Sequence, residues 1–273
     1  MKQIIFVLFA FLSTAAFSQK LPKISQLGTV SQTVGLNEIT ITYSRPNVNG
    51  RVVFGDLVSY DKVWRLGANE CTKFTCTEDI TIGNDVLPAG TYGMFAKITK
   101  NQWEIIFNSN SEQWGSYDLD PSMNILTYTA ASIESSHTET LSITFEQLMS
   151  SSANIVIRWD NVMVSIPFTT DTPAAVAKEV QATIEKGEDL AKVYYNAADY
   201  YNDIEDTETA HAHLDKSLEL ERAYYNVFMK AQWIAEEDPK EAKKLADEAI
   251  KLAEEADKKG WVNHMKRLSK EWK

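Results

Sequence analysis

Cysteine and histidine are scarce in this chain of 273 residues, and their scarcity excludes several kinds of site. The two cysteines, Cys71 and Cys76, cannot build a disulfide framework. Residues five apart on a strand point to opposite faces, so we expect two reduced thiols. No second Cys/His pair lies near them, so no zinc site is expected. The four histidines are scattered, and His137 is predicted to lie on a solvent-exposed polar loop without a nucleophile motif. We therefore expect no metal and no cofactor.

Glycine-rich phosphate loops and basic segments are lacking as well. Neither a Walker pattern nor G-x-G-x-x-G occurs anywhere in the sequence. Residues 19–170 carry 10 Lys and Arg against 15 Asp and Glu, and residues 171–273 carry 16 against 23. Because both parts are acidic, nucleic acid and anionic membranes are not expected to be the main partners.

The only long apolar run lies at the N-terminus. The segment IIFVLFAFL (4–12) follows Lys2 and is too short to span a bilayer. Ala16-Phe17-Ser18 fits the small-x-small rule for signal-peptide cleavage. We interpret residues 1–18 as a signal peptide and expect export to the periplasm or beyond. No later run is apolar enough for a membrane span.

From residue 27 to 168 the apolar pattern has a period of two. Turn motifs such as Asn49-Gly50 and Asp160-Asn161 separate segments rich in β-branched and aromatic residues. These segments are 36–43, 72–77, 90–98, 103–107, 140–148, 153–159 and 162–168. No helical pattern intervenes, so the sequence predicts an antiparallel sandwich or jelly roll of about eight to ten strands.

After Pro173 the apolar period becomes 3.6, which indicates an α-helical domain over residues 171–273. The predicted helices are 174–184, 190–204, 207–221, 223–236, 239–256 and 261–272. Asp206 and Asp238 stand where N-caps belong, and Pro239 takes the first helical position. The remaining 19–170 segment is predicted to be a β-domain.

The helical part also repeats with a shift of 32 residues. DTETA (206–210) followed by SLEL (217–220) recurs as DPKEA (238–242) followed by AIKL (249–252). Paired helices at this spacing resemble a tetratricopeptide-type array, whose usual period is about 34. Such an array would offer a concave surface to a protein partner. A helical cap that only shields one edge of the sandwich explains the repeat equally well.

Charged and aromatic side chains gather within 26 positions of the β-rich part. They are Arg45, Arg51, Trp64, Arg65, Asn69 and Glu70. Guanidinium groups recognise carboxylates and phosphates, so these residues could hold a small anionic or carbohydrate ligand, with Trp64 as a stacking face. We favour an internal brace, in which Arg51 or Arg65 pairs with Glu70, because buried charges come in satisfied sets. The ligand site remains the open alternative.

Several motifs occur in a characteristic order across the β-rich part. They are YSRP (43–46), Gly50-Arg51, FG (54–55), VWR (63–65), GANE (67–70), LPAGTY (87–92) and Trp114-Gly115. With them, residues 27–168 resemble the family known as domain of unknown function 2911, whose members are exported proteins of Gram-negative bacteria. Ser59 stands where we expect proline and Leu66 where we expect threonine. The resemblance implies no activity.

Two functions fit these observations. The first is an exported, non-enzymatic binding or scaffold protein of the cell envelope. The alternative is a hydrolase that cuts a glycan or another envelope polymer with carboxylates near the arginines. A carboxylate with a raised pKa in an open pocket beside Arg65 would favour the hydrolase.

Export gives the first test. If residues 1–18 are a signal peptide, the secreted chain begins at Gln19, because the cleavage rule places the cut after Ser18. N-terminal sequencing or the intact mass of exported material measures this directly. A mature product that retains Met1 contradicts the assignment.

Overall fold

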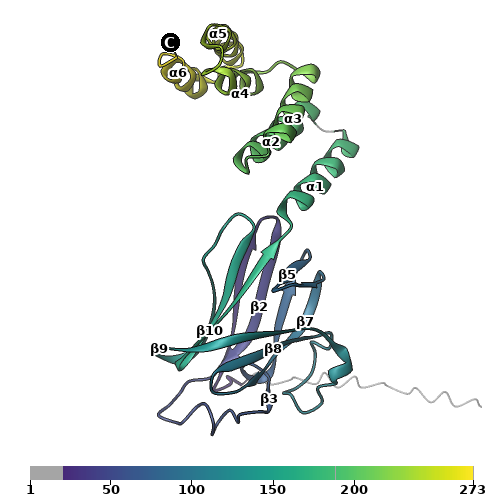
Figure 1. The fold of residues 1–273 in the computed structure, drawn as a ribbon, viewed down its shortest axis with the longest axis vertical. Helices are drawn as coiled ribbons and strands as arrows, with labels where there is room; N and C mark the ends of the chain where they lie inside the picture. The colour runs from purple at the N-terminus through teal and green to yellow at the C-terminus, as the bar shows by residue number, and fades with distance from the viewer. Residues whose placement is uncertain (1–20, 188, 273) are drawn as a thin grey trace, which may run out of the picture. The chain divides into compact units, whose positions relative to one another are not determined.

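The structure, a computed structural model, describes residues 21–187 and 189–272. The signal peptide expected over residues 1–18 lies outside the described residues. Contacts divide the chain into a unit that ends at Thr170 and a unit that begins at Asp171 (Figure 1). Among the described residues, no helix has both the length and the apolar character needed to cross a membrane.

The first unit is built on one large antiparallel sheet, which confirms the predicted β-class. Its strands are β1 (Gln26–Val34), β2 (Asn37–Arg45), β3 (Val63–Trp64), β4 (Ala68–Cys76), β5 (Ile80–Ile82), β6 (Asp85–Leu87), β7 (Gly90–Ile98), β8 (Gln102–Asn108), β9 (Asn124–Glu146) and β10 (Ser152–Thr170). Their order in the sheet is β1-β2-β4-β7-β8-β9-β10-β5-β6, and β3 pairs with β7. The sheet is open, because β1 and β6 lie at its two ends. A 3-10 turn, Pro121–Met123, precedes β9.

Strands β9 and β10 are both longer than the sequence indicated, and β10 shows the reason. Segments 153–159 and 162–168, predicted as separate strands, form the single strand β10 (Figure 1). Asp160 has a φ of 52°, and the pairing with β9 shifts register on both sides of it. The Asp160-Asn161 pair therefore makes a β-bulge instead of a turn, since one strand can absorb the irregularity without ending.

His137 also lies elsewhere than expected. The polar segment around it, predicted as a loop, belongs to β9, where Thr138 pairs with Asp160. The segment is a strand although it lacks buried alternation, because pairing with β10 satisfies its backbone while its side chains stay largely exposed. The His137 ring lies 3.3 Å from Glu139 Oε2 and from Asp160 Oδ1.

The core of the first unit comes from the inward-facing positions of the strands. Ile39 and Ile41 on β2 alternate with exposed or half-buried neighbours, as a period of two requires. Phe74 on β4 and Phe107 on β8 meet edge to face with ring centroids 5.1 Å apart. Burying each such side chain contributes about 1.5–3 kcal/mol. The sheet is stable because one face of each strand is apolar.

The second unit is helical, as the sequence predicted. Its helices are α1 (Thr172–Lys186), α2 (Leu190–Asp203), α3 (Thr207–Leu220), α4 (Tyr224–Ile234), α5 (Pro239–Glu255) and α6 (Lys259–Leu268). The carboxylates of Asp206 and Asp238 accept hydrogen bonds from the backbone N–H groups of Thr209 and Glu241. Both residues therefore cap their helices as expected.

The helices of the second unit pack mainly as sequence neighbours. Helix α2 packs against α3, and α4 packs against α5. Ser217 on α3 donates a hydrogen bond to the carbonyl of Ala191 on α2 at 2.6 Å, and Asn226 on α4 donates to Ser217 Oγ at 2.9 Å. The packing is compatible with a hairpin array, and the tetratricopeptide resemblance stays a prediction.

The division after Thr170 predicts that residues 19–170 fold alone. The inward-facing residues of the sheet form their own core, so the isolated segment needs no helical partner to bury its apolar surface. Circular dichroism should show a β-type spectrum with a cooperative thermal transition. An unfolded 19–170 segment would mean that the helices complete the core of the sheet.

Candidate functional site

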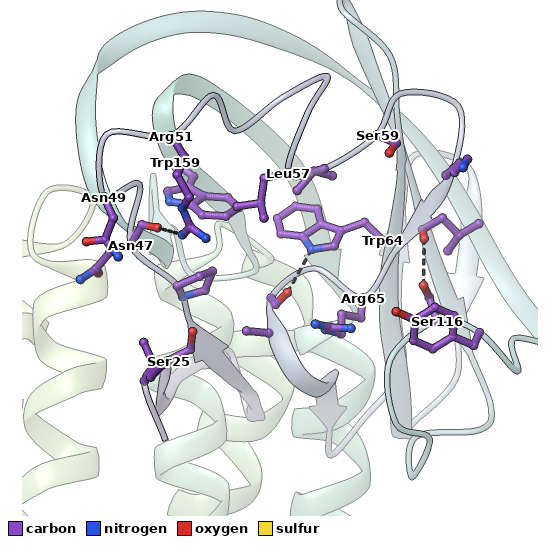
Figure 2. A pocket seen from close by; sticks show the side chains of 18 residues that line it. Ser25, Asn47, Asn49, Arg51, Leu57, Ser59, Trp64, Arg65, Ser116 and Trp159 are labelled. Carbon is purple, nitrogen blue, oxygen red and sulfur yellow. Dashed lines mark hydrogen bonds between the residues drawn. The ribbon is translucent and has the colours of Figure 1, made fainter. Parts of the chain in front are cut away.

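The loop end of the β-unit carries a hollow of about 600 Å³ (Figure 2). Its wall is formed largely by the long connection from β2 to β4, which contains β3 near its end. Ser116 and Tyr117, from the loop after β8, contribute a second side. Trp159 on β10 adds a residue from a strand far along the chain. Distant segments therefore build the hollow together.

Aromatic rings pack beneath this hollow. Trp64 stacks on Trp159 with ring centroids 5.7 Å apart and an interplanar angle of 19°. Trp103 meets Trp64 edge to face at 5.9 Å, and Phe54 contacts both Trp103 and Trp159. The indole Nε1 of Trp64 donates to the carbonyl of Gly67 at 3.0 Å. One Trp64 face is thus used by the core, which leaves only part of the ring for a ligand.

Arg51 and Arg65 both line the hollow, as does Lys62. Arg51 donates from Nε to the Val48 carbonyl at 3.0 Å and from Nη2 to the Asn47 carbonyl at 2.5 Å. In Figure 2 Arg51 is drawn at the Trp159 end and Arg65 below Trp64. Among the described residues that line the hollow there is no Asp, Glu or His. The lining thus carries positive charge. Just outside it, Glu139 accepts a hydrogen bond from the Asn49 backbone N–H at 2.8 Å, and the charge of Arg51 contributes to the lowered pKa of Glu139.

The other predicted site residues lie outside this hollow. Glu70 on β4 pairs with Lys23 at 2.5 Å, and its side chain is 43% exposed. The hydrogen bond from Lys23 is the main reason that the pKa of Glu70 is lowered. Glu70 lines a separate hollow of about 730 Å³ near the start of β1. The predicted pairing of Glu70 with Arg51 or Arg65 is therefore wrong, because a lysine distant in sequence reaches the carboxylate.

The side chains of Arg45 and Asn69 form hydrogen bonds within the protein. Arg45 Nε donates to the Leu141 carbonyl on β9 at 3.0 Å, and its guanidinium lies 5.9 Å from the Tyr43 ring centroid. Asn69 has a φ of 59°, and its amide donates to Ser44 Oγ at 3.1 Å and to the Ser25 carbonyl at 3.2 Å. Both residues connect segments through neutral acceptors. The structure thus separates the six predicted residues, with Arg51, Trp64 and Arg65 at the hollow.

The two cysteines are free and buried. Burial raises the pKa of Cys71, and it raises the pKa of Cys76 to about 11. Their sulfur atoms donate to the carbonyls of Ser111 and Pro88. Because only the thiolate is a good nucleophile, neither cysteine is suited to nucleophilic catalysis at neutral pH.

Sequence reasoning missed most residues of the hollow, among them Trp159 and Lys62. Trp159 and Lys62 carry no motif of their own, and Trp159 lies 94 positions after Arg65. The available signal was that Trp159 directly precedes the Asp160-Asn161 irregularity. This signal marks the end of a regular segment, but it does not indicate which distant loop the side chain meets.

These contacts predict that Asn69 matters more for stability than Glu70 does. Asn69→Ala removes two hydrogen bonds and places a non-glycine, non-asparagine residue at positive φ, so we expect a loss of about 1–3 kcal/mol. Glu70→Gln removes an exposed ion pair, which contributes at most about 1 kcal/mol. Chemical denaturation of both variants at neutral pH measures the difference. A larger loss for Glu70→Gln would place Glu70 in a buried pair.

The effect of Glu70→Gln should also depend on pH. The folded-state pKa of Glu70 is lowered, so the Lys23 pair stabilises the fold above the ordinary glutamate pKa of 4.5. This contribution is lost as the pH falls through the folded-state value. The stability difference between the natural chain and the variant should therefore shrink in acid, while a difference that grows would contradict the pairing.

The comparisons with known proteins agree with the motifs. A family model described as "Protein of unknown function (DUF2911)" matches residues 25–168. No curated protein and no solved structure matches the chain. The matched residues cover more than half of the chain and contain the whole sheet apart from the C-terminal end of β10. The chain therefore belongs to the DUF2911 family.

Proposed function

We propose that this chain is an exported, non-enzymatic binding protein of the cell envelope, and that its hollow holds a small anionic or carbohydrate ligand. The observation that carries the proposal is the charge of the lining. Arg51, Lys62 and Arg65 face the hollow, and the described lining residues include no acid. In a chain with a formal net charge of −11, a cationic hollow attracts anions that the remaining surface repels.

The size and surface of the hollow support the same function. A volume of about 600 Å³ lies within the range of roughly 300–1,000 Å³ that is typical of small-molecule sites. Tyr117 is 84% exposed and Leu57 is 44% exposed, and both line the hollow. Exposed aromatic and aliphatic groups beside cations can contact the apolar parts of an anionic ligand. We infer that the ligand has both charged and apolar surface.

The hydrolase alternative has less support. Its chemistry needs a carboxylate beside the arginines, and a general acid needs a raised pKa. Glu70, the acid of the predicted cluster, lies on another hollow, and its pKa is lowered. The hollow with Arg51 and Arg65 is lined by described residues that cannot act as a carboxylate acid or base. We therefore retain binding as the proposed function.

We also propose a protein partner for the helical unit. The pairing of α2 with α3 and of α4 with α5 supports an array of helical hairpins, which typically binds partners on a concave surface. A cation–π contact links the two pairs: Lys192 Nζ lies 4.1 Å from the Tyr195 ring centroid and 4.0 Å from that of Tyr225. This contact joins α2 to α4.

Calorimetric titration of residues 19–273 with a panel of probes tests the ligand proposal. The panel contains carboxylated and sulfated sugars, inorganic phosphate and neutral sugars. We expect at least one anionic probe to bind, with an affinity that falls as salt rises because surface charges are screened.

Two lysine variants make a matched pair for this titration. Lys62→Met removes a charge from the lining and should weaken binding a few-fold. Lys100→Met removes the same charge from an exposed position outside the hollow and should leave the affinity unchanged. Failure of every anionic probe to bind would refute the proposal, as would equal effects of the two variants.

A further inference from the structure

Two buried hydrogen-bond donors at the hollow have no partner among the described residues. They are Arg65 Nε and Trp159 Nε1. Trp159 is only 1% exposed, yet it lines the hollow. Buried polar groups in folded proteins nearly always have a partner, so each exception calls for an explanation.

The unpaired donors are not a general property of this aromatic cluster. Trp64, which stacks directly on Trp159, donates its own Nε1 to the Gly67 carbonyl at 3.0 Å. Gln113 Oε1 in the same unit also lacks a partner, but it is an acceptor and does not line the hollow. The unsatisfied atoms at the hollow are thus both donors, and they come from different parts of the chain.

The chemistry of these groups restricts the ligand. The guanidinium of arginine and the indole of tryptophan donate hydrogen bonds and cannot accept them. Arg51 and Lys62 add further donors with positive charge. A ligand that satisfies this lining must present acceptor oxygens at separate points, and at least one of them should be anionic.

We infer that the ligand is a sugar acid, which is a saccharide that carries a carboxylate; this inference rests on the proposed function. The carboxylate accepts hydrogen bonds from Arg65, whose planar group matches carboxylate geometry. A second oxygen of the same sugar accepts a hydrogen bond from Trp159. The hollow is much larger than an inorganic oxyanion, and the Tyr117 ring at its rim can face the C–H groups of a sugar ring.

The test compares glucuronate and galacturonate with glucose, galactose and inorganic phosphate on residues 19–273. We expect the uronates to bind at least about tenfold more tightly than the neutral sugars and phosphate, because a hydrogen bond to a charged group is the strongest of those available. Arg65→Met should abolish the preference for the uronate over its neutral parent. Circular dichroism confirms that each variant is folded.

Tryptophan variants test the second anchor, which is the hydrogen bond from the Trp159 indole to the sugar. Trp159→Phe removes only the indole donor and should weaken uronate binding about fivefold while keeping the preference over the neutral sugar. Trp103→Phe is the matched control, because Trp103 is buried, contacts the same Trp64 ring and does not line the hollow. Its uronate affinity should stay at the level of the natural chain. In the natural chain, the indole N–H resonance of Trp159 should shift when a uronate binds.

The outcomes separate the inference from the proposed function. Equal binding of phosphate and uronates, or a preference that survives Arg65→Met, would overturn the sugar-acid inference while binding of anions stands. A Trp159 indole resonance that does not move in the uronate complex would show that the ligand does not accept a hydrogen bond from this donor, and it would overturn that part of the inference. If no anionic probe binds, both the inference and the proposed function fail.

Discussion

The stack of Trp64 on Trp159 is the contact on which the loop end of the β-unit depends. Trp64 belongs to β3, a strand of two residues that pairs only with β7 and cannot hold a long connection by hydrogen bonds alone. The Trp159 ring, held on the long strand β10, gives that connection a fixed support. Phe54 contacts the same ring from earlier in the connection. Because these rings are packed, the neighbouring Arg51 and Arg65 have defined positions at the hollow.

Several charged side chains of this unit have partners within the protein, but Arg65 Nε has none among the described residues. Lys23 binds Glu70, while Arg45 and Arg51 direct hydrogen bonds to backbone carbonyls. Each of these contacts satisfies a group within the protein. No carboxylate of the described residues forms an ion pair with Arg65, so its charge remains available at the hollow. A brace through an ion pair of Arg65 with Glu70 is not formed, because Glu70 pairs with Lys23.

The bulge at Asp160 connects the sheet to the hollow. A regular strand would continue its alternation past Trp159, whereas the left-handed residue at 160 shifts the pairing with β9 on both sides. A bulge bends and twists its strand, so β10 can contribute to the main sheet and still place a tryptophan at the loop end. The same strand then pairs with β5 near residue 170. One irregular residue thus lets a single strand serve two parts of the unit.

The sequence by itself determined the elements that depend on neighbouring residues. The change of period near residue 170 predicted strands and then helices, and Asp206 and Asp238 cap their helices as expected, because periodicity and capping act within a few residues. The family motifs also identified the segment that carries Arg51, Trp64 and Arg65.

Only the tertiary structure decided how these residues are paired. Lys23 reaches Glu70 across 47 positions, and Trp159 meets Trp64 from a distant strand. Such contacts depend on strand order and register, which local patterns do not encode.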